Sequence, residues 1–198
     1  MIGIVDYGAG NLRSVANALD CIGVGFVVCC TSEDLKVVDK VVLPGVGHFA
    51  AAADHLAQTG LFSALRDWGR ERRPMLGICL GMQLLFEGGE EAPSIPGLGL
   101  LTGRVVRLQA RRVPHMGWNT VTVTGGRLMA SEGAEDHYYF AHSYVAAPSD
   151  PSVVSGWAKI DGVGFPAIVE DGRLSGVQFH PEKSGEAGLR LLMRFAQC

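Results

Sequence analysis

The sequence lacks the features of secreted, membrane-spanning and nucleic-acid-binding proteins. No apolar run in its 198 residues reaches the ~20 residues of a membrane span, and MIGIVDYGAG at the start has no basic region typical of a signal peptide. The 5 cysteines are odd in number and form no Cys-x-x-Cys pair, which argues against a disulfide framework. A formal net charge of −3 gives no general attraction to nucleic acid or anionic lipid. We therefore expect a cytoplasmic protein that binds neither.

Several ligand motifs are also absent. There is no Gly-x-x-x-x-Gly-Lys-[Ser/Thr] loop for phosphates and no His-Glu-x-x-His helix for zinc. Gly8-Ala9-Gly10 begins like a dinucleotide-binding turn, but Arg13 stands where the third glycine belongs. His48 and His55 are more typical of a helix surface than of metal ligands. We expect no metal and no cofactor.

The first part of the chain alternates between short apolar runs and segments with helical periodicity. Leu12, Val15, Ala16 and Leu19 have helical spacing behind Asn11, an expected N-cap. Apolar strands that alternate with amphipathic helices indicate a parallel sheet covered on both faces. The remaining predictions here are strands at Ile2–Val5, Val24–Cys29, Val41–Leu43 and Met75–Cys79, and helices at Phe49–Ala57, Leu61–Trp68 and Met82–Phe86.

After an expected loop at Ala92–Gly103 the pattern changes to short strands separated by turn residues, which favours antiparallel hairpins added to the same sheet. The last element is a helix that begins near Ser184. The predicted fold is α/β, a mostly parallel central sheet flanked by helices with added antiparallel strands, in a single domain over residues 1–198. The strands expected here are Arg104–Leu108, Asn119–Val123, Tyr138–Val145, Val153–Ala158, Ala167–Val169 and Leu174–Phe179.

The stretch Gly77-Ile78-Cys79-Leu80-Gly81 has the spacing of a nucleophile elbow, with cysteine in the central position. A strand precedes Cys79 and a helix follows it, so the sulfur lies at a helix N-terminus, whose N–H groups and dipole stabilise a thiolate and a developing oxyanion. A lone cysteine is more often a buried packing residue. The flanking glycines and the strand-to-helix change favour a nucleophile here.

Phe179-His180-Pro181-Glu182 supplies a base and a group to orient it. Pro181 favours an extended conformation at His180, and in extended chain residues two apart point to the same side. A carboxylate beside an imidazole fixes its tautomer and stabilises the imidazolium. Alone, the motif also fits a histidine at a strand end and a glutamate ahead of the last helix.

Pro44-Gly45-Val46-Gly47 forms a glycine-rich turn directly after a strand. Such turns gather at the carboxyl edge of a parallel sheet, where the active crevice of this architecture lies. The backbone N–H groups of this turn can form part of an oxyanion hole. By itself the segment is also compatible with a plain strand-to-helix turn.

LGICLGMQLLFE followed by HPE resembles the class I, or triad, glutamine amidotransferases. The finer resemblance is to the glutaminase subunits of imidazole glycerol phosphate synthase, an enzyme of histidine biosynthesis, and it covers essentially the whole chain. The segments that carry it are DYGAGNLRSV (6–15), LPGVGHF (43–49), IPGLGLLTGRVVRL (95–108), PHMGWN (114–119), YYFAHSY (138–144) and HPEKSGEAGLRLL (180–192).

The resemblance implies an activity. Cys79 attacks the carboxamide of glutamine to give a thioester, His180 acts as base and acid, and Glu182 orients it. It also implies an oxyanion hole from the backbone of Leu80, Gly45 and Val46, in a loop that rearranges before it can act. The glutamine-binding positions that it implies are Gln83, Ser143 and Tyr144.

The resemblance further implies a partner, a (βα)8-barrel cyclase subunit in a heterodimer. Ammonia passes through a channel to the cyclase and reacts with a ribonucleotide there, which gives imidazole glycerol phosphate and aminoimidazole carboxamide ribotide. A sealed path makes chemical sense because ammonia in bulk water would be protonated and lose its nucleophilicity. The positions that it implies for the partner interface are Asn11, Met116, Trp118, Tyr138 and Lys183.

Alternatives remain at this stage. The elbow and the HPE motif alone also fit the glutaminases of anthranilate or GMP synthase, and a stand-alone cysteine hydrolase would need the same residues. A non-catalytic scaffold subunit is a further alternative, which the complete set of catalytic residue types argues against.

Overall fold

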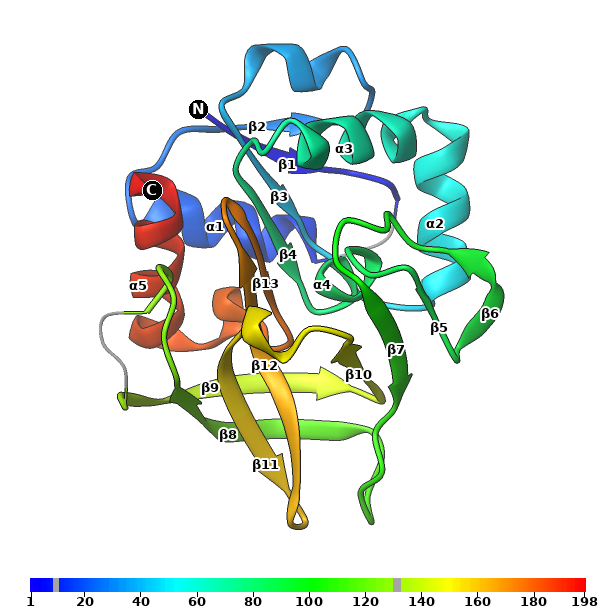
Figure 1. Cartoon of the computed structure of the whole chain (residues 1–198). Coiled ribbons are helices and arrows are strands. Elements are labelled where there is room, and N and C mark those ends of the chain that lie inside the picture. Colours follow the sequence, from blue (N-terminus) through cyan, green and yellow to red (C-terminus); the bar gives the residue numbers. More distant parts are fainter. Residues whose placement is uncertain (9–10, 130–132) are drawn as a thin grey trace.

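Strands and helices alternate along the N-terminal part, as the sequence predicts (Figure 1). The computed structural model describes residues 1–8, 11–129 and 133–198. Each predicted strand and helix in this part is confirmed, with ends shifted by a few residues at most. The elements are β1 (Ile2–Val5), α1 (Leu12–Cys21), β2 (Phe26–Cys29), η1 (Asp34–Val37), β3 (Lys40–Leu43), α2 (Phe49–Gln58), α3 (Leu61–Arg70), β4 (Met75–Ile78) and α4 (Leu80–Leu84).

The C-terminal part is rich in strands and ends in the expected helix, which begins directly after Ser184. Its elements are β5 (Gly88–Gly89), β6 (Ala92–Pro96), β7 (Gly103–Arg107), β8 (His115–Val123), β9 (Glu135–His142), β10 (Tyr144–Pro148), η2 (Pro151–Val153), β11 (Val154–Ile160), β12 (Val163–Asp171), β13 (Leu174–Val177), η3 (Pro181–Lys183) and α5 (Gly185–Gln197).

The larger sheet combines a parallel and an antiparallel region. Over the described residues its strand order is β2-β1-β3-β4-β13-β12-β11-β8-β9. The first five of these strands are parallel, and the last four continue the sheet antiparallel. This arrangement confirms the predicted fold class. Strands β4 and β13 are parallel neighbours, with Ile78 opposite Val177, so the segments that follow them meet at one edge.

Helices cover both faces of the parallel region, α1 and α5 on one side and α2 and α3 on the other (Figure 1). Successive strand residues point to opposite faces. Met75 therefore packs into the core under α2 and α3, whereas Leu76 and Ile78 pack into the core under α1 and α5. Burial of a large aliphatic side chain stabilises the fold by about 1.5–3 kcal/mol, so both layers hold the strand ends firmly in place.

The second sheet corrects two predictions. Its order is β10-β7-β5-β6, so the expected loop at Ala92–Gly103 contains a strand, β6. The strand predicted at Tyr138–Val145 is interrupted at Ser143, with β9 in the larger sheet and β10 in the smaller one. Apolar periodicity continues through Ser143, and for that reason it does not reveal that the chain changes sheets there.

Candidate active site

Cys79 lies in a strained turn between β4 and α4. Its backbone has φ 54° and ψ −108°, a conformation that non-glycine residues rarely adopt. Its N–H donates to the carbonyl of Val177 at 2.7 Å, which ties the turn to β13. A Cβ at position 81 would lie 1.8 Å from the carbonyl oxygen of Leu43, so only glycine lets α4 approach β3 this closely. The elbow predicted at residues 77–81 therefore has both the shape and the strain expected of it.

His180 and Glu182 form a buried pair. The Nδ1 atom of His180 lies 2.8 Å from Oε1 of Glu182, and their side chains are 1% and 0% exposed. His180 is extended, as Pro181 predicts, with φ −103° and ψ 95°. Because the carboxylate can only accept, Nδ1 carries the hydrogen and Nε2 is left for another partner.

The interactions of His180 favour its protonated form. Burial lowers its pKa, but contact with Cys79 and with the Glu182 carboxylate raises it to about 9. The Nε2 atom is buried and has no hydrogen-bond partner of normal geometry within the described residues. These contacts therefore favour an imidazolium beside the Cys79 sulfur, and a positive charge at that place would stabilise a thiolate.

Two residues at helix N-cap positions hold this pair instead of capping their own helices. Asn11 precedes α1, but its side chain makes no capping bond, and its Nδ2 donates to Glu182 Oε1 at 2.6 Å. Ser184 precedes α5 and also makes no capping bond. Its hydroxyl donates to the carbonyl of His180 at 2.6 Å and accepts from the N–H of Tyr139 at 3.0 Å. Asn11 is therefore the N-cap of α1 by position, as expected, but its side-chain amide binds Glu182 and makes no capping bond.

The Cys79 sulfur contacts two groups besides His180. Its thiol lies 3.8 Å from the carbonyl of Ala141, and Nε2 of Gln178 donates to the sulfur at 3.7 Å. Gln83 stands beside Gln178 and donates to its Oε1 at 3.2 Å and to the carbonyl of Tyr144 at 3.0 Å. Polar groups thus lie around the sulfur, and the residue Cys79 is only 5% exposed.

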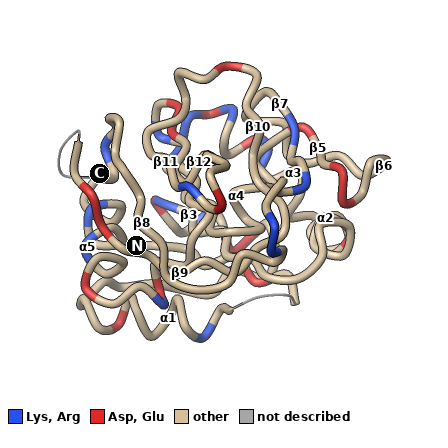
Figure 2. Tube along the Cα trace, turned by 90° about the horizontal axis from the view of Figure 1, so that it is seen from below, with Lys and Arg blue, Asp and Glu red and all other residues tan. Residues whose placement is uncertain are grey.

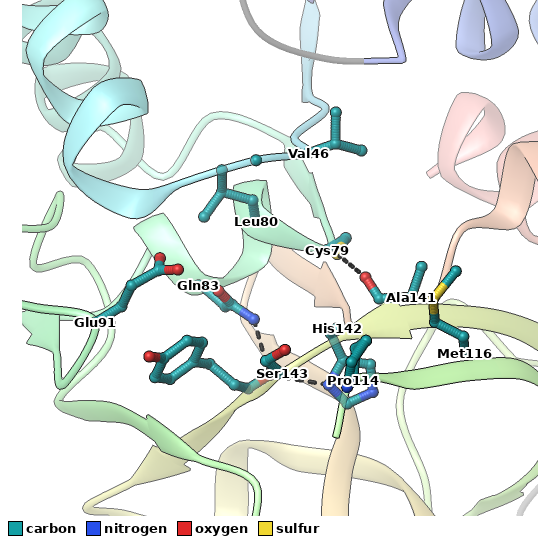
Figure 3. A pocket seen from close by; sticks show the side chains of 12 residues that line it. Val46, Cys79, Leu80, Gln83, Glu91, Pro114, Met116, Ala141, His142 and Ser143 are labelled. Carbon is teal, nitrogen blue, oxygen red and sulfur yellow. Dashed lines mark hydrogen bonds between the residues drawn. The ribbon is translucent and has the colours of Figure 1, made fainter. Parts of the chain in front are cut away.

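A cavity of about 280 Å³ opens beside the sulfur, close to the lower end of small-molecule sites. In the view of Figure 3, Gln83 lies between Cys79 and Glu91, so polar groups line the cavity along its length. The Glu91 carboxylate also accepts from the N–H of Phe49 at 2.8 Å, which fixes its position. The lining residues are Val46, Gly47, Cys79, Leu80, Gln83, Glu91, Pro114, Met116, Ala141, His142, Ser143 and Tyr144.

Comparisons with known proteins show the family of this chain. Residues 3–197 match the family described as glutamine amidotransferase class-I. The chain belongs to this family. It is 47% identical to the imidazole glycerol phosphate synthase subunit HisH of Synechococcus sp., over 98% of this chain and 92% of that protein. It is 46% identical to the subunit of the same name from Methanothermobacter thermautotrophicus, over 100% and 98%. A solved structure described as a glutamine amidotransferase superposes with a TM-score of 0.79 at 23% identity, covering 100% and 99% of the two chains.

In this amidotransferase, two of the three residues whose backbone is expected to form an oxyanion hole line the cavity. Leu80 begins α4, so its N–H has no partner within the helix, and both Leu80 and Val46 line the cavity. Gly45 lies behind them: a Cβ there would come within 2.7 Å of the Gly81 nitrogen and 2.8 Å of the Leu80 Cβ. The hydroxyl of Tyr7 donates to the Pro44 carbonyl at 2.7 Å and holds this loop.

The sequence motifs predict no role for two buried histidines, of which one, His142, lines the cavity. His142 Nδ1 donates to the Tyr144 carbonyl at 2.9 Å, so its Nε2 accepts from His115 Nδ1 at 3.0 Å. Asn119 then donates to Nε2 of His115 at 3.3 Å. Burial and the neighbouring His115 lower the pKa of His142 to about 3. These neutral, hydrogen-bonded side chains fix the bend at Ser143. Their signal in the sequence is one histidine in each of the segments 114–119 and 138–144.

The residues expected at a partner interface differ in how far they are exposed. Met116 and Trp118 are 64% and 58% exposed, and Met116 also lines the cavity. Lys183 lies over the ring of Tyr139 at 5.8 Å. Tyr138 is 1% exposed and stacks on Phe179 with ring centroids 3.9 Å apart, so it belongs to the core. The expectation for Tyr138 does not fit this burial, because strand alternation turns its neighbour Tyr139 outward instead.

Acidic and basic residues are interspersed along the chain (Figure 2). Helix α5, for example, carries both signs, with Glu186, Arg190 and Arg194. In the described ranges 1–8, 11–129 and 133–198, no group of three or more His, Cys, Asp or Glu side chains is arranged to hold a metal ion. None of the helices in those ranges is long and apolar enough to cross a membrane.

Proposed function

We propose that this chain, acting as one domain over residues 1–198, is the glutamine-hydrolysing subunit of an imidazole glycerol phosphate synthase. The observation that carries the proposal is the adjacency of β4 and β13, since it brings a strained cysteine, which lines a cavity, into contact with the histidine of a buried histidine–glutamate pair. Identity of 46–47% over nearly the whole chain to subunits of that name supports the choice of synthase.

The proposed reaction has two steps, in which a thioester forms on Cys79 and water then hydrolyses it. His180 donates a proton in the first step and accepts one in the second. The Cys79 sulfur attacks the side-chain carboxamide carbon of glutamine and forms a C–S bond. His180 gives its Nε2 proton to the departing nitrogen as the C–N bond breaks, so ammonia leaves and a thioester remains. Water then attacks the thioester, His180 takes a proton from it, the C–S bond breaks, and glutamate is released. Glu182 keeps the imidazole in the required tautomer.

The cavity offers complementary groups for the rest of the substrate. Gln83, Ser143 and Tyr144 line it and are the proposed glutamine-binding residues. Glu91 is an acidic side chain of the same lining, and its charge complements the α-ammonium group of an amino acid. The backbone N–H groups of Leu80 and of the loop at Gly45 and Val46 are proposed to stabilise the oxyanion.

The proposed partner is a (βα)8-barrel cyclase subunit that forms a heterodimer with this chain. Met116 joins the cavity to the surface, and the exposed Trp118 lies on the same strand, β8. Trp and Met are enriched in protein interfaces. A subunit docked over Met116, Trp118 and Lys183 would cover the mouth of the cavity, so ammonia would reach the cyclase before water protonates it. Asn11, next to Glu182, is proposed to lie at the margin of this interface.

The test is reconstitution with the cyclase of the same source. Glutamate release is measured for the chain alone, for the complex, and for the complex with its nucleotide substrate. We expect release to rise on complex formation and again with nucleotide. Cys79→Ser should abolish product formation from glutamine but retain it from added ammonia, while Cys30→Ser, a change at an exposed cysteine, should retain both. Glutamine-dependent product from Cys79→Ser would contradict the mechanism, and indifference to the cyclase would contradict the partner.

A further inference from the structure

Gln178 belongs neither to the acid–base pair nor to the residues that line the cavity. It follows β13 and is 0% exposed, and its backbone N–H donates to the carbonyl of Ala167 at 2.9 Å. A buried amide side chain has to find partners for its donors and acceptor. Both of the partners that Gln178 finds belong to the site: Cys79 Sγ at 3.7 Å and Gln83 Nε2 at 3.2 Å.

The hydrogen-bond network fixes which end of the Gln178 amide faces the sulfur. Gln83 Nε2 has two hydrogens and faces two acceptors, the carbonyl of Tyr144 and Oε1 of Gln178. Because Oε1 of Gln178 has to accept from Gln83, its Nε2 has to face Cys79. Reversal of the Gln178 amide would place an oxygen against the sulfur and a donor against the donor of Gln83. The N–H group toward the sulfur is thus specified by residues on two other elements, Gln83 on α4 and Tyr144 on β10.

An N–H group at this place favours the charged form of the sulfur. A hydrogen bond to the ionised form of a group stabilises that form, and the effect is stronger away from water. Unlike His180, Gln178 cannot give up its proton, so it remains a donor at every stage of the reaction. It stabilises the thiolate before attack, and it does so again when the sulfur leaves the thioester.

We propose that Gln178 is a catalytic residue whose amide N–H stabilises the Cys79 thiolate, with Gln83 holding that amide in the required orientation. The inference rests on the proposed function, in which Cys79 is the nucleophile. It assigns a role in nucleophile activation to a residue outside the Cys79–His180–Glu182 set.

The test follows the sulfur directly, without glutamine. The rate of alkylation of Cys79 by iodoacetamide is measured against pH by mass spectrometry of the peptide that contains it. Gln178→Met removes the donor at similar size, and Gln178→Glu keeps the shape but places a carboxyl group against the sulfur. We expect the midpoint of the profile to rise by about one pH unit in Gln178→Met, a roughly ten-fold loss of thiolate at fixed pH, and further in Gln178→Glu. Gln109→Glu, the same change at an exposed position, should leave the midpoint unchanged.

A second measurement separates the proposed role from a packing role and from the proposed function. In the complex with the cyclase, Gln178→Met should lower kcat for glutamine about ten-fold with KM within about two-fold, because the lost contact is to the nucleophile. An unchanged alkylation midpoint in both folded variants would overturn the inference, even if kcat fell. A Gln178→Met variant that does not fold leaves the decision to the isosteric Gln178→Glu. If the wild-type complex does not hydrolyse glutamine, the proposed function fails instead, whatever the alkylation profiles are.

Discussion

The proposed nucleophile and the proposed acid–base pair are held in place by different means. The turn at Cys79 is formed within its own five-residue segment by the positive φ of Cys79, and the glycine at position 81 lets that segment approach Leu43 on β3. His180 and Glu182 depend on residues far along the chain, Asn11 at a separation of 171 positions and Tyr139 on the edge strand β9. A short motif can therefore specify a nucleophile, whereas the orientation of its base depends on the assembled fold.

The largest expected effect comes from breaking the elbow. Gly81→Ala should destabilise the protein by at least about 3 kcal/mol, because the new Cβ would lie 1.8 Å from the Leu43 carbonyl oxygen and neither backbone can withdraw easily. Denaturant unfolding measures the change. The matched control is Gly164→Ala in β12, where a Cβ meets nothing within 4 Å, and we expect a change within about 0.5 kcal/mol. Equal stability of the two variants would contradict a backbone clash at the elbow.

The next effect tests how His180 is held. Ser184→Ala leaves the Tyr139 N–H and the His180 carbonyl without their shared partner. We expect the activation free energy to rise by about 2 kcal/mol, which corresponds to about a 30-fold lower kcat in the complex. KM for glutamine should change little. Ser184→Thr keeps the hydroxyl and should recover most of the activity. Ser175→Ala, at a buried serine whose hydroxyl has no partner in the described residues, is the control and should retain kcat. An Ala variant as active as wild type would separate Ser184 from the catalytic pair.

A smaller effect is expected at the carboxylate. Asn11→Ala removes the donor to Glu182 Oε1, a bond to a charged group that contributes about 1.5 kcal/mol, so kcat should fall about ten-fold. Asn17→Ala, at an exposed position of the same helix, should have no effect on kcat. If Asn11→Ala weakened only binding of the cyclase and left kcat at saturating cyclase unchanged, its role would lie in the interface alone.

The most gradual effect, spread over several pH units, is a pH dependence of stability from two buried histidines of opposite behaviour. The pKa of His180 is raised from 6.5 to about 9, so its contribution is complete below pH 6.5 and lost as the pH rises to about 9, by about 1 kcal/mol per pH unit. The pKa of His142 is lowered to about 3, so its contribution is present above pH 6.5 and lost as the pH falls below it. Denaturant unfolding from pH 5 to 9.5 measures both slopes. His180→Asn should remove the alkaline slope and His142→Asn the acidic one. If both variants lost the same slope, the two histidines would not act in separate pH ranges as predicted.

Much of the fold follows from local pattern, and the failures have identifiable causes. Apolar periodicity predicts β1 to β4 and their helices, because strands covered on both faces form short apolar runs and each helix buries one face. The same periodicity does not detect the change of sheet at Ser143, since the side-chain pattern continues while the hydrogen-bonding partner strand changes. Tyr138 and Tyr139 are indistinguishable by type, and only the register of β9 with β8 decides which ring is buried.

The candidate site divides along the same line. Cys79, His180 and Glu182 can be chosen from the sequence because their residue types and spacing match the needs of the chemistry. Gln178 and Ser184 lie in or beside the same motif but carry no such signal, because a buried amide or hydroxyl can bond in many directions. Their partners are known only once β13, β9 and α4 are assembled.

By itself the sequence determined which chemical groups this protein contains, the order of its strands and helices, and the glycines that permit a sharp turn at Cys79. The tertiary structure alone decided that β4 and β13 are neighbours and that the side chains of Asn11 and Ser184 serve the catalytic pair rather than their own helices. The physical reason is that turns and periodicity depend on neighbours in the chain. Strand order and buried polar bonds depend instead on groups that meet only when distant segments pack together.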